Sequence, residues 1–154
     1  MTEAMRLALP LFFAVGCVSE ELPGSYFNVD RVGAENGCTG NGTNFSERMA
    51  YRIEYHSNEV VLAVGEDVWA TGISDGCTVT YDSIVWTSNR NGHTIDWQVS
   101  GEAQVDPDGG NTCSSELDWK GTETYFITNS EHPDVNPGCE YVLDVRGKHS
   151  KTVE

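Results

Sequence analysis

Apolar and polar residues alternate along most of the chain between residues 26 and 146. The clearest run covers residues 94–105, where Ile95, Trp97 and Val99 fall on one face while Asp96 and Gln98 fall on the other. A period of two is typical of a β-strand with one buried and one solvated face. Similar β-rich runs occupy residues 26–32, 49–56, 60–64, 68–73, 78–87, 117–127 and 139–146. The pattern therefore predicts an all-β protein of eight strands with no helix.

Short turns separate most of these runs, and Asn91-Gly92 is a strong β-hairpin signal. Strands joined by short turns pair with their neighbours in sequence, which gives an antiparallel up-and-down meander. Closing the meander removes its exposed edges, so we expect an eight-stranded barrel. A β-sandwich is the alternative, but it needs long crossing connections, and only residues 33–46 and 130–138 offer them.

The five cysteines test this topology, since successive strand ends alternate between the two rims of a meander. Cys38 follows the first predicted strand and Cys139 begins the last, which places both on one rim. Cys77 and Cys113 precede the fifth and seventh strands, on the opposite rim. Only the pairing Cys38–Cys139 with Cys77–Cys113 keeps each disulfide on one rim. We therefore predict these two bonds, the first of which would close the first strand against the last.

The remaining cysteine, Cys17, follows an apolar segment near the N-terminus. Arg6, an apolar run over residues 7–15 and the small residue Gly16 are the parts of a secretory signal. The apolar run is too short to span a bilayer. Ala14-Val15-Gly16-Cys17 resembles the lipobox of bacterial lipoproteins.

The lipobox resemblance implies that the signal is cut before Cys17, which then carries diacylglycerol and an acylated amine such as a palmitate amide. Val18 follows it rather than the Asp of inner-membrane retention, so the resemblance implies anchoring at the outer membrane. The alternative is an ordinary secreted protein with Cys17 in a disulfide. The odd cysteine count favours the anchor, because the other four cysteines pair among themselves.

These observations divide the chain into four parts. We expect a signal peptide over residues 1–16 and a lipidated tether over 17–23. The barrel domain would cover residues 24–149, and residues 150–154 would form a fraying polar tail.

Gly24-Ser25-Tyr26 resembles the Gly-x-Trp motif that opens the first strand of lipocalins, with Tyr26 in place of Trp. Arg146 on the last strand could correspond to the basic residue that packs over that ring in lipocalins. The resemblance implies a lipocalin-like barrel that binds a small apolar molecule. Bacterial lipocalins are themselves lipoproteins.

Charge and motifs narrow the function further. The chain carries 24 acidic and 9 basic residues, a formal net charge of -15, which excludes binding to a nucleic-acid phosphate backbone. The sequence has no His-x-His, His-Glu-x-x-His or Cys-x-x-Cys motif and no glycine-rich phosphate loop. We therefore expect neither an enzyme nor a metal or other cofactor.

The inner face of the predicted strands carries several large side chains that could either line a ligand pocket or fill the barrel. These candidates are Tyr51, Tyr55, Trp97, Trp119, Glu123 and Tyr141. Glu123 points inward by strict alternation from Trp119 and Tyr125. Because an inward carboxylate needs partners, either a β-bulge near Gly121 turns it outward or it is a polar handle for a ligand.

The sequence thus predicts a non-enzymatic cell-envelope lipoprotein that binds a small apolar ligand. The alternative is a structural or protein-interaction lipoprotein with a filled core, for example a protease-inhibitor-like module, that contacts an envelope protein through its rim loops. A void lined by Trp97 and Tyr141 would distinguish the two.

Overall fold

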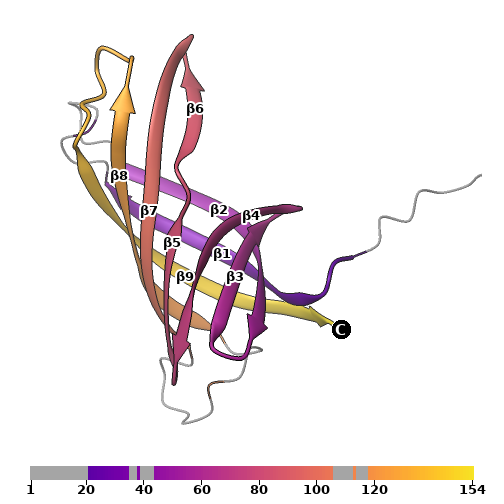
Figure 1. Cartoon of the computed structure of the whole chain (residues 1–154). Helices are drawn as coiled ribbons and strands as arrows, with labels where there is room; N and C mark the ends of the chain where they lie inside the picture. The colour runs from indigo at the N-terminus through magenta and orange to yellow at the C-terminus, as the bar shows by residue number, and fades with distance from the viewer. Residues whose placement is uncertain (1–20, 35–37, 39–43, 106–112, 114–117) are drawn as a thin grey trace, which may run out of the picture.

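The computed structural model describes residues 21–34, 38, 44–105, 113 and 118–154. Cys17 and the signal segment lie outside these residues. The strands are β1 (Gly24–Ala34), β2 (Asn44–His56), β3 (Glu59–Val64), β4 (Asp67–Asp75), β5 (Thr78–Ser83), β6 (Trp86–Arg90), β7 (His93–Val105), β8 (Trp119–Ser130) and β9 (Glu140–Val153). Every pairing is antiparallel. Eight strands close into a barrel through the β5–β7 and β1–β9 pairs, and β6 is an additional outer strand (Figure 1). The predicted all-β up-and-down barrel is confirmed.

The predicted strand 78–87 is divided into β5 and β6. β5 pairs with the end of β7, where Thr78 lies opposite Gln104, and β6 pairs with its beginning, where Trp86 lies opposite Trp97. Around the interruption at residues 84 and 85, side chains supply hydrogen bonds: the Val99 N–H donates to Ser83 Oγ at 2.8 Å. Only β5 also pairs with β4, so β6 projects beside β7 at one end of the barrel (Figure 1).

The two rims are defined by the direction of β1. At the lower rim β1 begins and β9 ends; at the upper rim β1 ends and β9 begins. Cys38 and Cys139 form a disulfide at the upper rim, with Cα atoms 5.3 Å apart. Cys77 and Cys113 form a disulfide at the lower rim, with Cα atoms 4.8 Å apart. Both predicted bonds are confirmed.

The prediction that residues 150–154 form a fraying polar tail is wrong, because β9 continues to Val153 and pairs with the start of β1. Lys151 lies opposite Tyr26, and the Ser25 and Thr152 hydroxyls are 3.3 Å apart. Polar residues on both faces hide this segment from a pattern search. Backbone pairing with β1 nevertheless holds it in the barrel, which therefore extends beyond residue 149.

The contact expected between Arg146 and Tyr26 is also wrong. Arg146 is exposed and lies opposite Asp30, further along β1. The basic group over the Tyr26 ring is Lys151, whose Nζ lies 5.0 Å from the ring centroid. The pairing register explains the difference, since the strand end that meets Tyr26 is the segment expected to fray.

One hydrophobic cluster fills the barrel between the rims. Its largest members are Phe27, Tyr51, Trp69, Tyr81, Trp119 and Tyr125. Trp119 lies against Gly147 of the neighbouring strand, where a Cβ atom would fall 2.2 Å from the indole ring. A glycine is therefore needed there to admit the large ring.

Candidate functional site

Glu123 lies in the centre of the barrel with none of its surface exposed. β8 pairs with β7 in continuous register from Trp119 to Ile127, and the irregularity in this pairing falls beyond that segment. The β-bulge considered near Gly121 is therefore wrong, and Glu123 points inward as strict alternation requires.

Four donors surround the Glu123 carboxylate, and together with it they form what we term the Glu123 network. Oε1 accepts hydrogen bonds from the Tyr51 hydroxyl at 3.1 Å and the Tyr81 hydroxyl at 2.9 Å. Oε2 accepts from Arg31 Nε and from the Tyr125 hydroxyl, each at 3.1 Å. Because both oxygens are satisfied within the protein, the carboxylate offers no free group to a ligand.

The backbone register brings Tyr81 within reach of Glu123. Tyr81, Gly101 and Glu123 lie opposite one another on β5, β7 and β8. A Cβ atom at Gly101 would fall 2.1 Å from the Tyr81 ring. The missing side chain therefore lets the ring cross β7 to the carboxylate.

Arg31 is the cation of the Glu123 network and is 4% exposed. Besides Glu123, its guanidinium donates to Glu47 Oε2 at 2.8 Å. The guanidinium carbon lies 5.0 Å from the centroid of the Tyr125 ring. Sequence reasoning missed Arg31, although it shares the parity of the buried Phe27 on β1. A buried cation on the inner face was the signal that Glu123 had a partner.

Burial is the largest influence on the pKa values of Glu123, Tyr51 and Tyr81. It raises the pKa of Glu123, while Arg31 and the tyrosine hydroxyls act in the opposite direction. Burial and the neighbouring carboxylate raise the pKa values of Tyr51 and Tyr81 well above 10.0. The tyrosines therefore remain hydrogen-bond donors, and the network is a closed structural unit.

Towards the lower rim the barrel contains a cavity of about 10 Å³, lined in part by Tyr55 and Trp119. That volume accommodates about one water molecule. Three of the six residues predicted to line a ligand pocket, Tyr51, Trp119 and Glu123, therefore belong to a filled interior. A fourth, Tyr55, is half-buried and also lines an open hollow of about 260 Å³ beside the start of β1.

A larger pocket opens at the upper rim, with a volume of about 200 Å³. We term it the upper-rim pocket; it is lined by Cys38, Ser88, Arg90, Ile95, Trp97, Ile127, Val135 and Tyr141. The structure thus brings Trp97 and Tyr141, the other two predicted residues, into one pocket wall.

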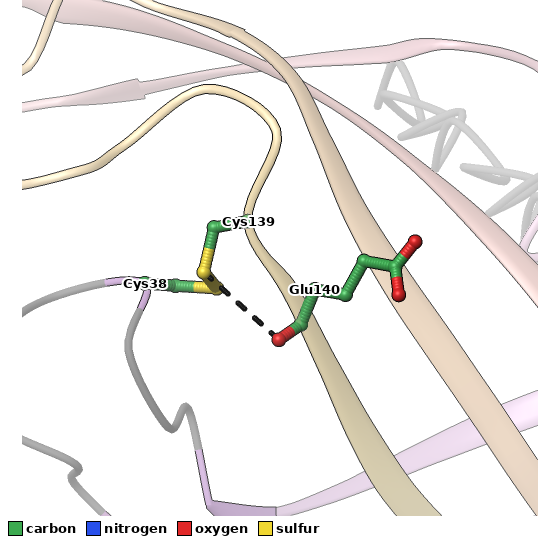
Figure 2. The surroundings of a disulfide bond; sticks show 3 residues. All are labelled: Cys38, Cys139 and Glu140. Carbon is green, nitrogen blue, oxygen red and sulfur yellow. Dashed lines mark hydrogen bonds between the residues drawn. A yellow bond between two sulfur atoms is a disulfide. The ribbon is translucent and has the colours of Figure 1, made fainter.

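The Cys38–Cys139 disulfide holds one side of the upper-rim pocket, beside the start of β9 (Figure 2). Backbone hydrogen bonds reinforce it: the Asn136 N–H donates to the Cys38 carbonyl at 3.3 Å, and the Gly138 N–H donates to the Ile127 carbonyl at 2.8 Å. These contacts fix the segment that carries Val135. The pocket is therefore framed by a covalent crosslink.

A row of aromatic rings crosses β6, β7, β8 and β9 at the base of the pocket. Trp86 stacks on Trp97 with centroids 6.3 Å apart, and Trp97 lies 5.6 Å from Tyr125. Tyr125 stacks on Tyr141 at 4.9 Å and also donates to Glu123. The pocket floor is thereby tied to the buried Glu123 network.

Sequence reasoning missed the other residues that line the upper-rim pocket, because the pocket forms where two hairpins and a disulfide come together in the folded chain.

Within residues 21–34, 38, 44–105, 113 and 118–154, no cluster of three or more His, Cys, Asp or Glu side chains is arranged to hold a metal ion. The same residues include no helix that is long and apolar enough to cross a membrane. Comparison with protein-family models, curated proteins and solved structures gives no match.

Proposed function

We propose that this chain is an exported, non-enzymatic envelope lipoprotein whose barrel binds a small apolar ligand in the upper-rim pocket. The observation that carries the proposal is the contrast between a filled interior and a pocket of about 200 Å³ lined by Trp97 and Tyr141. Aromatic and aliphatic walls with a few polar groups are typical of small-molecule sites.

The pocket size indicates the class of ligand. An engineered apolar cavity of about 150 Å³ binds benzene. A pocket of about 200 Å³ therefore suits a single ring with a short substituent rather than a long acyl chain. This supports ligand binding at the rim, in contrast to the interior cavity of a lipocalin.

Replacing Trp97 by alanine is expected to weaken binding of benzyl alcohol, a neutral single-ring probe, by about tenfold. The substitution removes the largest apolar surface in the pocket wall. Isothermal titration calorimetry measures the change. Phe126→Ala is the matched control, since Phe126 is an exposed aromatic residue on the neighbouring β8. If the Trp97→Ala protein and the unaltered protein bind benzyl alcohol with equal affinity, the upper-rim pocket is not the binding site.

The proposed anchor at Cys17 has a geometric consequence. Residues 17–23 lead into β1 at the lower rim and span at most about 25 Å when extended. The upper-rim pocket would then open away from the membrane. Several acyl chains on one cysteine would anchor the protein stably.

In a bacterial host, a Cys17→Ser variant is expected to be recovered without detergent, whereas the unaltered chain requires it. A Ser19→Ala variant serves as the control, because it changes a neighbouring residue and leaves the cysteine. Membrane fractionation followed by immunoblotting measures the distribution. Continued retention of the Cys17→Ser protein in membranes would contradict the anchor.

A protein-interaction role is the second candidate. Ile84 and Val85 are 66% and 52% exposed where β6 leaves the barrel wall, and Val68 on β4 is 50% exposed. Among the described strands, β6 pairs only with β7, and the free edge of a strand is a general site for strand addition. Most of the loop over residues 33–46 that suggested this role lies outside the described residues, so these exposed groups are its support.

A further inference from the structure

We propose that the upper-rim pocket selects a small aromatic monocarboxylate, with Arg90 as the partner of the carboxylate. The inference rests on the proposed function, namely that this pocket binds a small apolar ligand, and it adds the charge and shape of that ligand.

Arg90 stands at the end of β6 and faces the pocket. Residues two apart on a strand point to the same side. Ser88 and Arg90 line the pocket, and Trp86 on the same face stacks against Trp97 of its wall. Ser88 and Arg90 are both exposed, so Arg90 contributes to the solvent-accessible part of the pocket lining.

The guanidinium is available for a ligand. Arg31, Arg48 and Arg52 each form an ion pair with a carboxylate. Among the described residues, none forms a salt bridge or a side-chain hydrogen bond with Arg90. An arginine fork matches a carboxylate with two parallel hydrogen bonds.

The charge of the pocket differs from that of the chain. The chain has a formal net charge of -15, yet the lining of the pocket contains Arg90 and no acidic residue. Arg90 would repel a cationic ligand, and no acidic side chain in the lining would attract it. An anionic group would neutralise it, so the local charge favours an anion.

The remaining lining determines the rest of the ligand. Trp97 and Tyr141 offer ring faces on which an aromatic group stacks. Ile95, Ile127 and Val135 also line the pocket and offer no hydrogen-bonding side chain. A second carboxylate would be buried there without a partner, at a large desolvation cost. The pocket therefore favours one carboxylate attached to one ring.

Calorimetric titration with phenylacetate and phenylacetamide tests this inference, since the two probes share a shape and differ in charge. The unaltered protein is expected to bind phenylacetate about tenfold more tightly than phenylacetamide. Arg90→Gln is expected to remove this preference, because it lowers the affinity for phenylacetate by more than the affinity for phenylacetamide. Arg90→Lys should restore part of the preference, because a point charge replaces the planar fork. Arg146→Gln, which alters an exposed arginine on β9, should have no effect.

The possible failures are distinguishable. Equal affinity for the two probes, or an equal loss of both in Arg90→Gln, overturns the selection of an anion and leaves an apolar pocket. If the protein binds phenylacetate, phenylacetamide and benzyl alcohol all undetectably, the proposed function fails and this inference fails with it.

Discussion

Glu123→Ala is expected to lower the free energy of unfolding by about 3–5 kcal/mol, the usual cost of breaking a buried ion pair from one side. The substitution takes the buried Glu123 carboxylate away from the Arg31 guanidinium, and the Glu47 side chain that also pairs with Arg31 is 46% exposed. It also removes the acceptor of the Tyr51 and Tyr81 hydroxyls, which are buried. Urea denaturation followed by tryptophan fluorescence measures the change.

Two comparisons separate this effect from general damage to the sheet. Glu102→Ala removes an exposed carboxylate from β7 and should change the free energy of unfolding by less than about 0.5 kcal/mol. The double variant Arg31→Met with Glu123→Leu should recover about 2 kcal/mol relative to Glu123→Ala, because it leaves no unpaired buried charge. If the free energy of unfolding of Glu123→Ala lies within about 1 kcal/mol of that of the unaltered protein, the Glu123 network does not stabilise the core.

Removal of the Cys38–Cys139 disulfide is the second change with a large expected effect. The bond joins residues 101 positions apart, and a loop of that length gives about 4.7 kcal/mol in the chain-entropy model. A Cys38→Ser, Cys139→Ser variant should therefore be destabilised by about 3–5 kcal/mol. It should also bind benzyl alcohol more weakly, since Cys38 lines the upper-rim pocket.

The second disulfide is a built-in control. Cys77 and Cys113 are 36 positions apart, for which the same model gives about 3.8 kcal/mol. Replacing both by serine should cost less stability, and binding at the opposite rim should be preserved. A greater loss of ligand affinity from the Cys77 and Cys113 replacements than from those at Cys38 and Cys139 would contradict the assignment of the pocket.

Alternation and cysteine parity were sufficient to predict the barrel and both disulfides. Each strand has one buried face, and a one-residue shift would expose its whole apolar set, so the register is strongly specified. The end of β9 escaped prediction because Lys148, Ser150 and Thr152 belong to a segment with little apolar contrast. Its pairing depends on the backbone of β1, which a pattern of side chains does not record.

The interruption between β5 and β6 escaped prediction for a related reason. Ile84 and Val85 look like strand residues, yet they are exposed where the chain leaves the barrel wall. The hydrogen bonds that make up for the interruption come from Ser83 and Gln98, which are distant in sequence. Local propensity favours a continuous strand, and tertiary contacts decide otherwise.

The candidate site was only partly predictable. Parity placed Trp97, Glu123 and Tyr141 on the inner face, but it could not separate a filled interior from a pocket. That distinction depends on Arg31, which engages Glu123 from β1, and on the disulfide that frames the rim. Both are contacts between strands far apart in the sequence.

A two-dimensional ¹H–¹⁵N NMR titration with benzyl alcohol tests the central claim, that the protein binds ligands at the upper rim. We expect saturable shifts at the amides of Ile95, Ile127 and Tyr141 and at the indole N–H of Trp97. The amides of Tyr55 and Trp119, at the small lower cavity, should not move. Shifts concentrated at Tyr55 and Trp119, or no saturable shift at the upper-rim pocket, would contradict it.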